Sequence, residues 1–196
     1  MRTQTRMPLR EAVDVVRGVR RDEDIVVSSM GTAREWMALG PLHERDFVFV
    51  PSAMGHATSL GLGLALAQPQ RRVIVLSGDG SLLMSLGSLV TIAAAAPANL
   101  TVVLYDNGVY EVTGAQQTPG ALVPSGVDFV AMAHASGFTS VRRWSAIEEW
   151  KTGASEALGA PGPTLVVLDV APVPGAVGPR SPGPTAERAR RFMEAL

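Results

Sequence analysis

The chain has 196 residues, 46 % of them hydrophobic, and a formal net charge of −1. This length suffices for one domain with a substantial core. The composition excludes a disordered chain and gives no electrostatic argument for binding nucleic acid. The sequence contains no cysteine, which excludes disulfides, thiolate metal sites and cysteine nucleophiles.

Segments typical of helices and strands alternate from the N-terminus onward. Residues 1–10 lack the apolar core of a signal peptide, and apolar residues then recur at helical spacing. The predicted elements of the first part are a helix over 8–19, a strand over 25–27, a helix over 33–39 capped by Thr32, a strand over 47–50, a turn over 52–55 and a helix over 57–67.

The same alternation continues to the C-terminus. The predicted elements are strands over 73–76, 100–105, 139–143 and 164–170, helices over 82–96, 128–136, 147–158 and 186–196, a polar loop over 109–123 and a Pro/Gly-rich connector over 171–184. This order predicts an α/β fold, a doubly wound parallel sheet with helices on both faces, in a single domain over 1–196. The most apolar stretch, 82–96, is too short and mixed to span a membrane, so we expect a cytoplasmic protein.

Two oxygen-bearing side chains follow two of the predicted strands. Asp79 lies in a Gly-Asp-Gly-Ser turn, residues 78–81, directly after the strand over 73–76, and Asn107 follows the strand over 100–105. Ligands bind at the carboxyl ends of strands in open parallel sheets. A carboxylate and an amide oxygen suit Mg²⁺ or Ca²⁺, and the turn's glycines and helix N-terminus favour a phosphate. The alternative is an ordinary strand-to-helix turn with two glycines.

The spacing of these motifs resembles that of thiamine diphosphate enzymes, in which GDG is followed by Asn-x-x-Tyr, here Asn107 to Tyr110. The resemblance implies that Asp79, Asn107 and the backbone carbonyl of Val109 bind the metal ion. The cofactor-binding residues that it implies are Ser52, Met54, Gly78, Asp79, Gly80, Ser81, Asn107, Val109 and Tyr110.

A second resemblance covers Ser52 to His56. In these enzymes a bulky apolar residue, here Met54, supports the bent cofactor, and the carbonyl at Ser52 would accept from its aminopyrimidine. The alternative for Met54 is an ordinary core methionine. His56 is the candidate catalytic residue, facing the thiazolium or an anionic substrate group. Its alternative is a histidine at a helix start, bonded to backbone.

The resemblance narrows to the decarboxylases of 3-sulfopyruvate and 3-phosphonopyruvate, and in particular to the β subunit of sulfopyruvate decarboxylase. It implies decarboxylation of an anionic 3-substituted pyruvate to an aldehyde and carbon dioxide. In this family a glutamate from a pyrimidine-binding (PYR) domain activates the cofactor. No such domain is present in these residues, so we expect a partner subunit and a hetero-oligomer such as α2β2 or larger.

Two rival functions remain: a carboligase subunit of the acetolactate synthase type, and a non-catalytic phosphate- or nucleotide-binding regulatory module. Four further positions have open roles. Thr113 stands where some relatives have a catalytic glutamate, and Glu111 is either its substitute or a solvated loop charge. The polar stretch 116–118 is expected to close over the substrate, and Arg180 either pairs with an anionic substrate or is simply exposed.

Overall fold

The main sheet is built from seven strands, and every pair in it is parallel. The computed structural model describes residues 6–51 and 54–196. The strands of the main sheet are β1 (Met7–Pro8), β2 (Ile25–Ser29), β3 (Asp46–Phe49), β4 (Val73–Gly78), β5 (Leu100–Asp106), β8 (Ser140–Trp144) and β9 (Thr164–Ala171). Their order is β1-β9-β5-β4-β2-β3, and β8 also pairs with β9. The predicted parallel sheet is confirmed.

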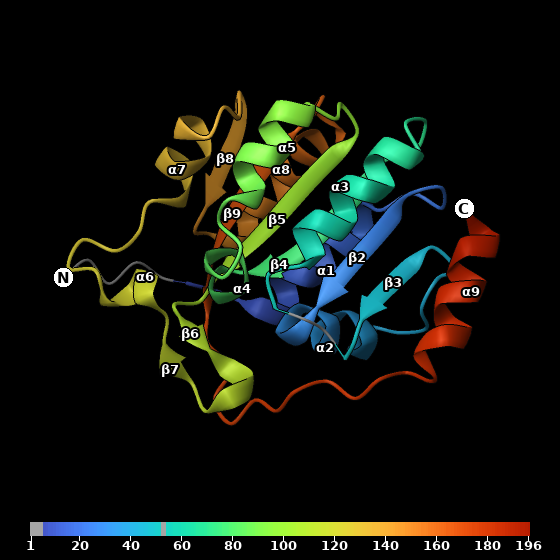
Figure 1. The fold of residues 1–196 in the computed structure, drawn as a ribbon. Coiled ribbons are helices and arrows are strands. Elements are labelled where there is room, and N and C mark those ends of the chain that lie inside the picture. Colours follow the sequence, from blue (N-terminus) through green and yellow to red (C-terminus); the bar gives the residue numbers. More distant parts are fainter. Residues whose placement is uncertain (1–5, 52–53) are drawn as a thin grey trace.

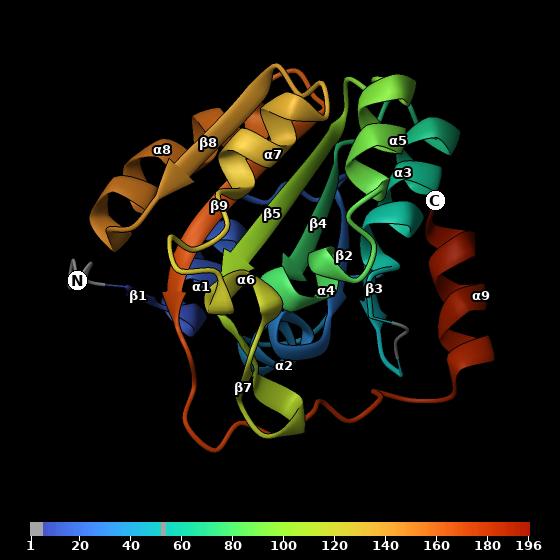
Figure 2. The same ribbon diagram turned by 60° about the vertical axis from the view of Figure 1, so that its left-hand side comes forward.

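Helices cover both faces of this sheet (Figures 1 and 2). The helices are α1 (Leu9–Val19), α2 (Met30–Ala38), α3 (Ala57–Ala67), α4 (Asp79–Leu83), α5 (Ser88–Ala95), α6 (Pro119–Leu122), α7 (Phe129–Ala135), α8 (Ile147–Gly159) and α9 (Thr185–Ala195), with a 3-10 turn η1 (Glu111–Thr113). Helices α3, α5 and α7 pack on one face, and α1, α2 and α8 on the other. This arrangement is the predicted doubly wound architecture.

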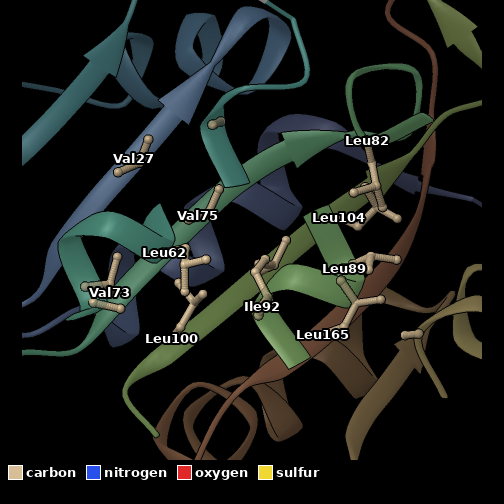
Figure 3. Close-up of a cluster of buried hydrophobic side chains, with 14 of the residues drawn as sticks. Val27, Leu62, Val73, Val75, Leu82, Leu89, Ile92, Leu100, Leu104 and Leu165 are labelled. Carbon is tan, nitrogen blue, oxygen red and sulfur yellow. The ribbon is translucent and has the colours of Figure 1, made fainter. Parts of the chain in front are cut away.

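The core lies in two layers, one on each side of the sheet. Figure 3 shows the layer under α3 and α5, where Leu62 lies beside Leu100 and Leu82 beside Leu104. Strands β4 and β5 are buried on both faces, and their side chains are accordingly almost continuously apolar. These central strands therefore form a rigid support for whatever follows their carboxyl ends.

Three predicted segments differ from the structure. The helix expected over 82–96 is two helices, α4 and α5, separated by residues 84–87, which include the poor helix formers Ser85 and Gly87. Thr32 is the third residue of the helix rather than its N-cap: α2 begins at Met30 after Ser29, and Thr32 Oγ1 accepts from the Ser29 N–H at 3.3 Å in a capping box and donates to the carbonyl of Leu76. The loop expected over 109–123 contains an antiparallel hairpin of β6 (Val109–Tyr110) and β7 (Gln116–Gln117), followed by α6.

The C-terminal helix α9 covers the edge strand β3 (Figure 1). The rings of Phe47 and Phe192 lie 5.0 Å apart between them. The Arg188 guanidinium donates to the carbonyls of Val48, at 2.6 Å, and Val50, so the exposed sheet edge is blunted. Among the described residues, no helix is both long and apolar enough to cross a bilayer.

Candidate functional site

The two predicted oxygen ligands follow neighbouring strands at the same edge of the sheet. Asp79 is the first residue of α4, directly after β4, and Asn107 directly follows β5. The two strands pair with Gly78 opposite Tyr105. The register therefore brings Asp79 and Asn107 together, as the sequence predicted.

The Asp79 carboxylate is buried and already partnered. Its side chain accepts a hydrogen bond from the Thr118 hydroxyl at 3.0 Å. Burial, and then the nearby Asp106 carboxylate, raise the pKa of Asp79 to about 6. A buried carboxylate held beside another carboxylate favours a cation as its partner.

The Asn107 amide is oriented by two hydrogen bonds. Its Oδ1 accepts from the backbone N–H of Val109 at 2.9 Å, and its Nδ2 donates to Glu111 Oε1 at 2.9 Å. The amide oxygen is therefore turned toward Val109 and retains a second lone pair for an ion. Val109 itself lines the same cleft.

The two glycines of the GDG turn, Gly78 and Gly80, are required for different structural reasons. A Cβ on Gly80 would stand 2.7 Å from Tyr110 Cδ1 and 3.1 Å from the Thr118 methyl group. A Cβ on Gly78 would meet no atom within 4 Å, although Gly78 lines the cleft. Gly80 therefore lets the Tyr110 ring pack on α4, whereas Gly78 leaves room in the cleft for a ligand.

Ser81 connects the turn to the segment before α3. Its hydroxyl oxygen accepts from the buried backbone N–H of Gly55 at 2.8 Å, and its proton remains available to donate to a ligand. Gly55 has φ +89°, and a Cβ on it would stand 3.0 Å from the Cβ of Ser85, so only glycine fits there. Met54 beside it is half-buried and lines the cleft, whereas Ser52 lies outside the described residues.

These residues surround one open cleft at the carboxyl edge of the sheet. Its walls also include a segment that the sequence analysis did not select, Ser29 to Thr32 at the junction of β2 and α2. Met30 there adopts φ +51°, which is strained for a side chain of its size. The sequence Ser-Ser-Met-Gly, residues 28–31, follows the predicted strand over 25–27 and was the signal that could have indicated this segment.

A buried hydroxyl group without a protein partner also borders the cleft. Tyr105 is 2 % exposed, and its Oη has no hydrogen-bond partner among the described residues. Burial raises the pKa of Tyr105, so the hydroxyl remains a donor. Unpaired buried donors are costly. The open space at Gly78 and this donor fit a ligand rich in acceptor oxygens, such as a diphosphate.

Charged groups of both signs surround Asp79. Asp106 is close enough to Asp79 for the two carboxylates to repel each other. Burial, and then Asp169, raise the pKa of Asp106. Two arginines lie beside them: Arg6, whose Nη1 donates to the carbonyl of Asn107 at 2.8 Å, and Arg143, which is bound at 2.6 Å to Asp169 and lies 3.9 Å from Asp106. Across residues 6–51 and 54–196, no three His, Asp or Glu side chains form a metal-binding group.

Some predicted residues lie away from the cleft or have different surroundings. His56 is exposed at the start of α3, with Nδ1 3.2 Å from the carbonyl of Met54, and Arg180 is exposed on the connector. Glu111 is not a solvated loop charge, because it is buried and paired with Arg34. Thr118 is fully buried beneath Asp79 and does not cover the cleft.

A doubly wound parallel sheet with a cleft at its carboxyl edge is the arrangement in which α/β domains bind their ligands. Residues 29–168 match the family described as thiamine pyrophosphate enzyme, C-terminal TPP binding domain. The chain belongs to this family, and the expected resemblance is confirmed.

Individual relatives agree with this assignment. The chain is 43 % identical over 171 residues to phosphonopyruvate decarboxylase of Streptomyces hygroscopicus, covering 86 % of this chain and 41 % of that protein. It is 38 % identical over 164 residues to sulfopyruvate decarboxylase subunit beta of Methanothermobacter thermautotrophicus, covering 83 % of this chain and 81 % of that subunit. Among solved structures, the thiamine diphosphate-dependent 4-hydroxybenzoylformate decarboxylase of Rhodococcus jostii RHA1 superposes with a TM-score of 0.71. It is 26 % identical, covering 87 % of this chain and 34 % of that one.

Proposed function

We propose that this chain is the diphosphate- and Mg²⁺-binding part of a thiamine diphosphate-dependent decarboxylase that acts on an anionic 3-substituted pyruvate. The observation that carries the proposal is that Asp79 and Asn107 follow two paired strands and line one cleft, beside the open space at Gly78. Bound thiamine diphosphate supplies the electron sink for loss of carbon dioxide. We take residues 1–196 to act as one domain.

Within this proposal each group of the chain has a distinct task. Asp79, the Asn107 amide oxygen and the Val109 carbonyl hold the ion. The Ser81 hydroxyl and the Tyr105 hydroxyl donate toward the diphosphate. Without a cation between them, the nearby carboxylates would repel the diphosphate. Met54, which lines the same cleft, would support the bent cofactor.

A partner subunit completes the proposed enzyme. The family's activating glutamate belongs to a PYR domain, and the relative that this chain spans for 81 % of its length is named a beta subunit. We therefore expect the isolated chain to bind the cofactor without turnover. A purified isolated chain that turns over substrate would contradict this part of the proposal.

The substrate class rests on the two names that recur among the relatives. Phosphonopyruvate and sulfopyruvate both carry a negative group on C3, and both occur in the names of relatives at least 38 % identical to this chain. His56 is the residue that we propose for contact with the substrate. In the reconstituted enzyme, His56→Gln should lower kcat and leave the affinity for thiamine diphosphate unchanged.

The experiment pairs this chain with a chain that carries the PYR domain and offers sulfopyruvate, phosphonopyruvate and pyruvate in turn. Formation of the aldehyde from an anionic 3-substituted pyruvate would support the proposal. Formation of an acetolactate-type product from pyruvate would replace it with carboligation. Tight binding of NAD without any binding of thiamine diphosphate would indicate the regulatory nucleotide-binding module instead.

A further inference from the structure

Glu111 is a buried side chain whose two carboxylate oxygens are bonded to three separate segments. Its Oε1 accepts from Asn107 Nδ2 at 2.9 Å and from the backbone N–H of Val173 at 2.8 Å. Its Oε2 accepts from Arg34 Nη2 at 3.1 Å. The side chain is 5 % exposed. One carboxylate thus joins the loop after β5, helix α2 and the connector after β9, over residues 172–184.

Arg34 extends this set of contacts to a second point on the connector. Its Nη1 donates to the carbonyl of Val177 at 3.3 Å, and its Nε donates to Glu35 at 2.7 Å. The connector is therefore held at Val173 directly by Glu111 and at Val177 through Arg34. In Figure 1 this segment runs from β9 past the β6–β7 hairpin to α9.

The hydrogen bond from Asn107 to Glu111 determines which way the Asn107 amide faces. With the amide as described, Oδ1 faces the Val109 N–H and Nδ2 faces the Glu111 carboxylate. If the amide were reversed, its NH2 group would face the Val109 N–H and its oxygen would face the Glu111 carboxylate. Neither contact could be a hydrogen bond. Glu111 and Val109 therefore fix the same orientation, in which the amide oxygen is the atom offered to an ion.

A close contact beside the cleft strengthens the case for a specific arrangement. A Cβ on Gly31 would stand 3.3 Å from Glu111 Oε2. Gly31 lines the cleft, as do Glu111 and Asn107. Glu111 therefore lies against the β2–α2 junction as well as against the loop that carries Asn107.

We propose that Glu111 is a positioning residue that couples the loop after β5, which carries Asn107, to the connector. It fixes the Asn107 amide oxygen toward the ion and, through the same carboxylate, holds the connector in place. Because coupling between two sites is reciprocal, binding of the ion and cofactor should protect the connector, and loosening the connector should weaken ion binding. This inference rests on the proposed function of Asp79 and Asn107.

Tryptic cleavage after Arg180 measures the state of the connector without any requirement for activity. Arg180 is exposed and is followed by Ser181, so the bond is open to trypsin. In the wild-type chain, Mg²⁺ with thiamine diphosphate should slow the appearance of this fragment, followed by mass spectrometry. In Glu111→Gln, cleavage should be faster by roughly tenfold, the change expected for one lost hydrogen bond to a charged group, and it should no longer respond to the ligands.

Binding of Mn²⁺, followed by electron paramagnetic resonance in the presence of thiamine diphosphate, measures the other end of the coupling. Glu111→Gln should weaken Mn²⁺ binding by roughly tenfold. The matched control is Glu35→Gln, which removes the other carboxylate on Arg34 but touches neither Asn107 nor Val173. That control should bind Mn²⁺ as the wild type does, and equal weakening in both variants would overturn the proposal.

A second variant keeps the test decisive if Glu111→Gln fails to fold. Val173→Pro removes the backbone donor to Glu111, together with the packing of the Val173 side chain, and leaves the Asn107 contact in place. It should speed cleavage after Arg180 and weaken Mn²⁺ binding. If the wild type binds Mn²⁺ with thiamine diphosphate and Val173→Pro binds it equally well, the coupling is wrong. If the wild type itself binds neither, the proposed function is wrong instead.

Discussion

The ring of Tyr110 packs on the backbone of Gly80, so closely that a Cβ on Gly80 would stand 2.7 Å from Tyr110 Cδ1. This contact joins the two halves of the predicted motif, because Gly80 follows β4 and Tyr110 follows β5. The GDG turn and the Asn-x-x-Tyr loop therefore form one packed unit. The second glycine is required by this packing, and the first by the open cleft.

Alanine substitution should lower the stability of the chain at Gly80 and weaken ligand binding at Gly78. Gly80→Ala should lower the free energy of unfolding by about 1–3 kcal/mol, since the ring of Tyr110 must move. Gly78→Ala should leave stability nearly unchanged, because its Cβ meets no atom and its φ of −88° suits alanine, but it should weaken binding of thiamine diphosphate. Urea unfolding and calorimetric titration of both variants check this, and equal stability losses would contradict it.

Asp79→Asn should stabilise the ion-free chain near neutral pH. The pKa of Asp79 is raised from 3.8 to about 6, so the folded chain binds this proton more tightly than the unfolded chain does. The stability that this proton contributes is complete below about pH 4 and is lost as the pH rises through about 6. At pH 8 the variant should gain on the order of 2–3 kcal/mol over the wild type.

The measurement for Asp79 is urea unfolding at pH 4 and pH 8 in the absence of divalent ions. The difference between variant and wild type should be large at pH 8 and small at pH 4. Addition of Mg²⁺ with thiamine diphosphate should stabilise only the wild type. A difference that is the same at both pH values would show that Asp79 is not protonated by burial.

Tyr105→Phe should separate stability from ligand binding. The hydroxyl is buried without a partner among the described residues, so its removal should leave the ligand-free chain as stable as before or more stable by about 1 kcal/mol. The affinity for thiamine diphosphate should fall by roughly tenfold, as expected for one lost donor to a charged group. Unchanged affinity would mean that the hydroxyl does not face the diphosphate.

Ser81→Ala should destabilise the fold as well as the site. The buried N–H of Gly55 would lose its acceptor, which costs about 1–3 kcal/mol. Ser85→Ala is the matched control, because the Cβ of Ser85 packs on Gly55 and remains after the substitution. Thermal unfolding should distinguish the two variants, and a stable Ser81→Ala chain would argue against this link between α4 and the segment before α3.

The sequence was sufficient to predict the parallel sheet, because buried parallel strands are apolar throughout and their boundaries stand out. Helix α3 was predicted with its observed bounds, Ala57–Ala67. The break between α4 and α5 was not, since apolar side chains continue across it. The hairpin of β6 and β7 was also missed, because its strands have two residues each and no alternating pattern.

The polar contacts of the site were the least predictable part. Thr118 and Glu111 are far from Asp79 and Arg34 in sequence, and only the hairpin brings them together. Both read as loop residues when considered alone. The Asp79 and Asn107 positions were predictable because they follow long apolar strands, whose register places their ends at one edge of the sheet. The catalytic role of His56 stays a prediction.

The most direct test of the central claim is calorimetric titration of the purified chain with thiamine diphosphate, with and without Mg²⁺, for the wild type, Asp79→Ala and Asn107→Ala. The account predicts binding to the wild type only when Mg²⁺ is present, and loss of that binding in both variants. Binding of equal affinity without Mg²⁺, or retained in Asp79→Ala, would contradict the assignment of this cleft as an ion-dependent diphosphate site.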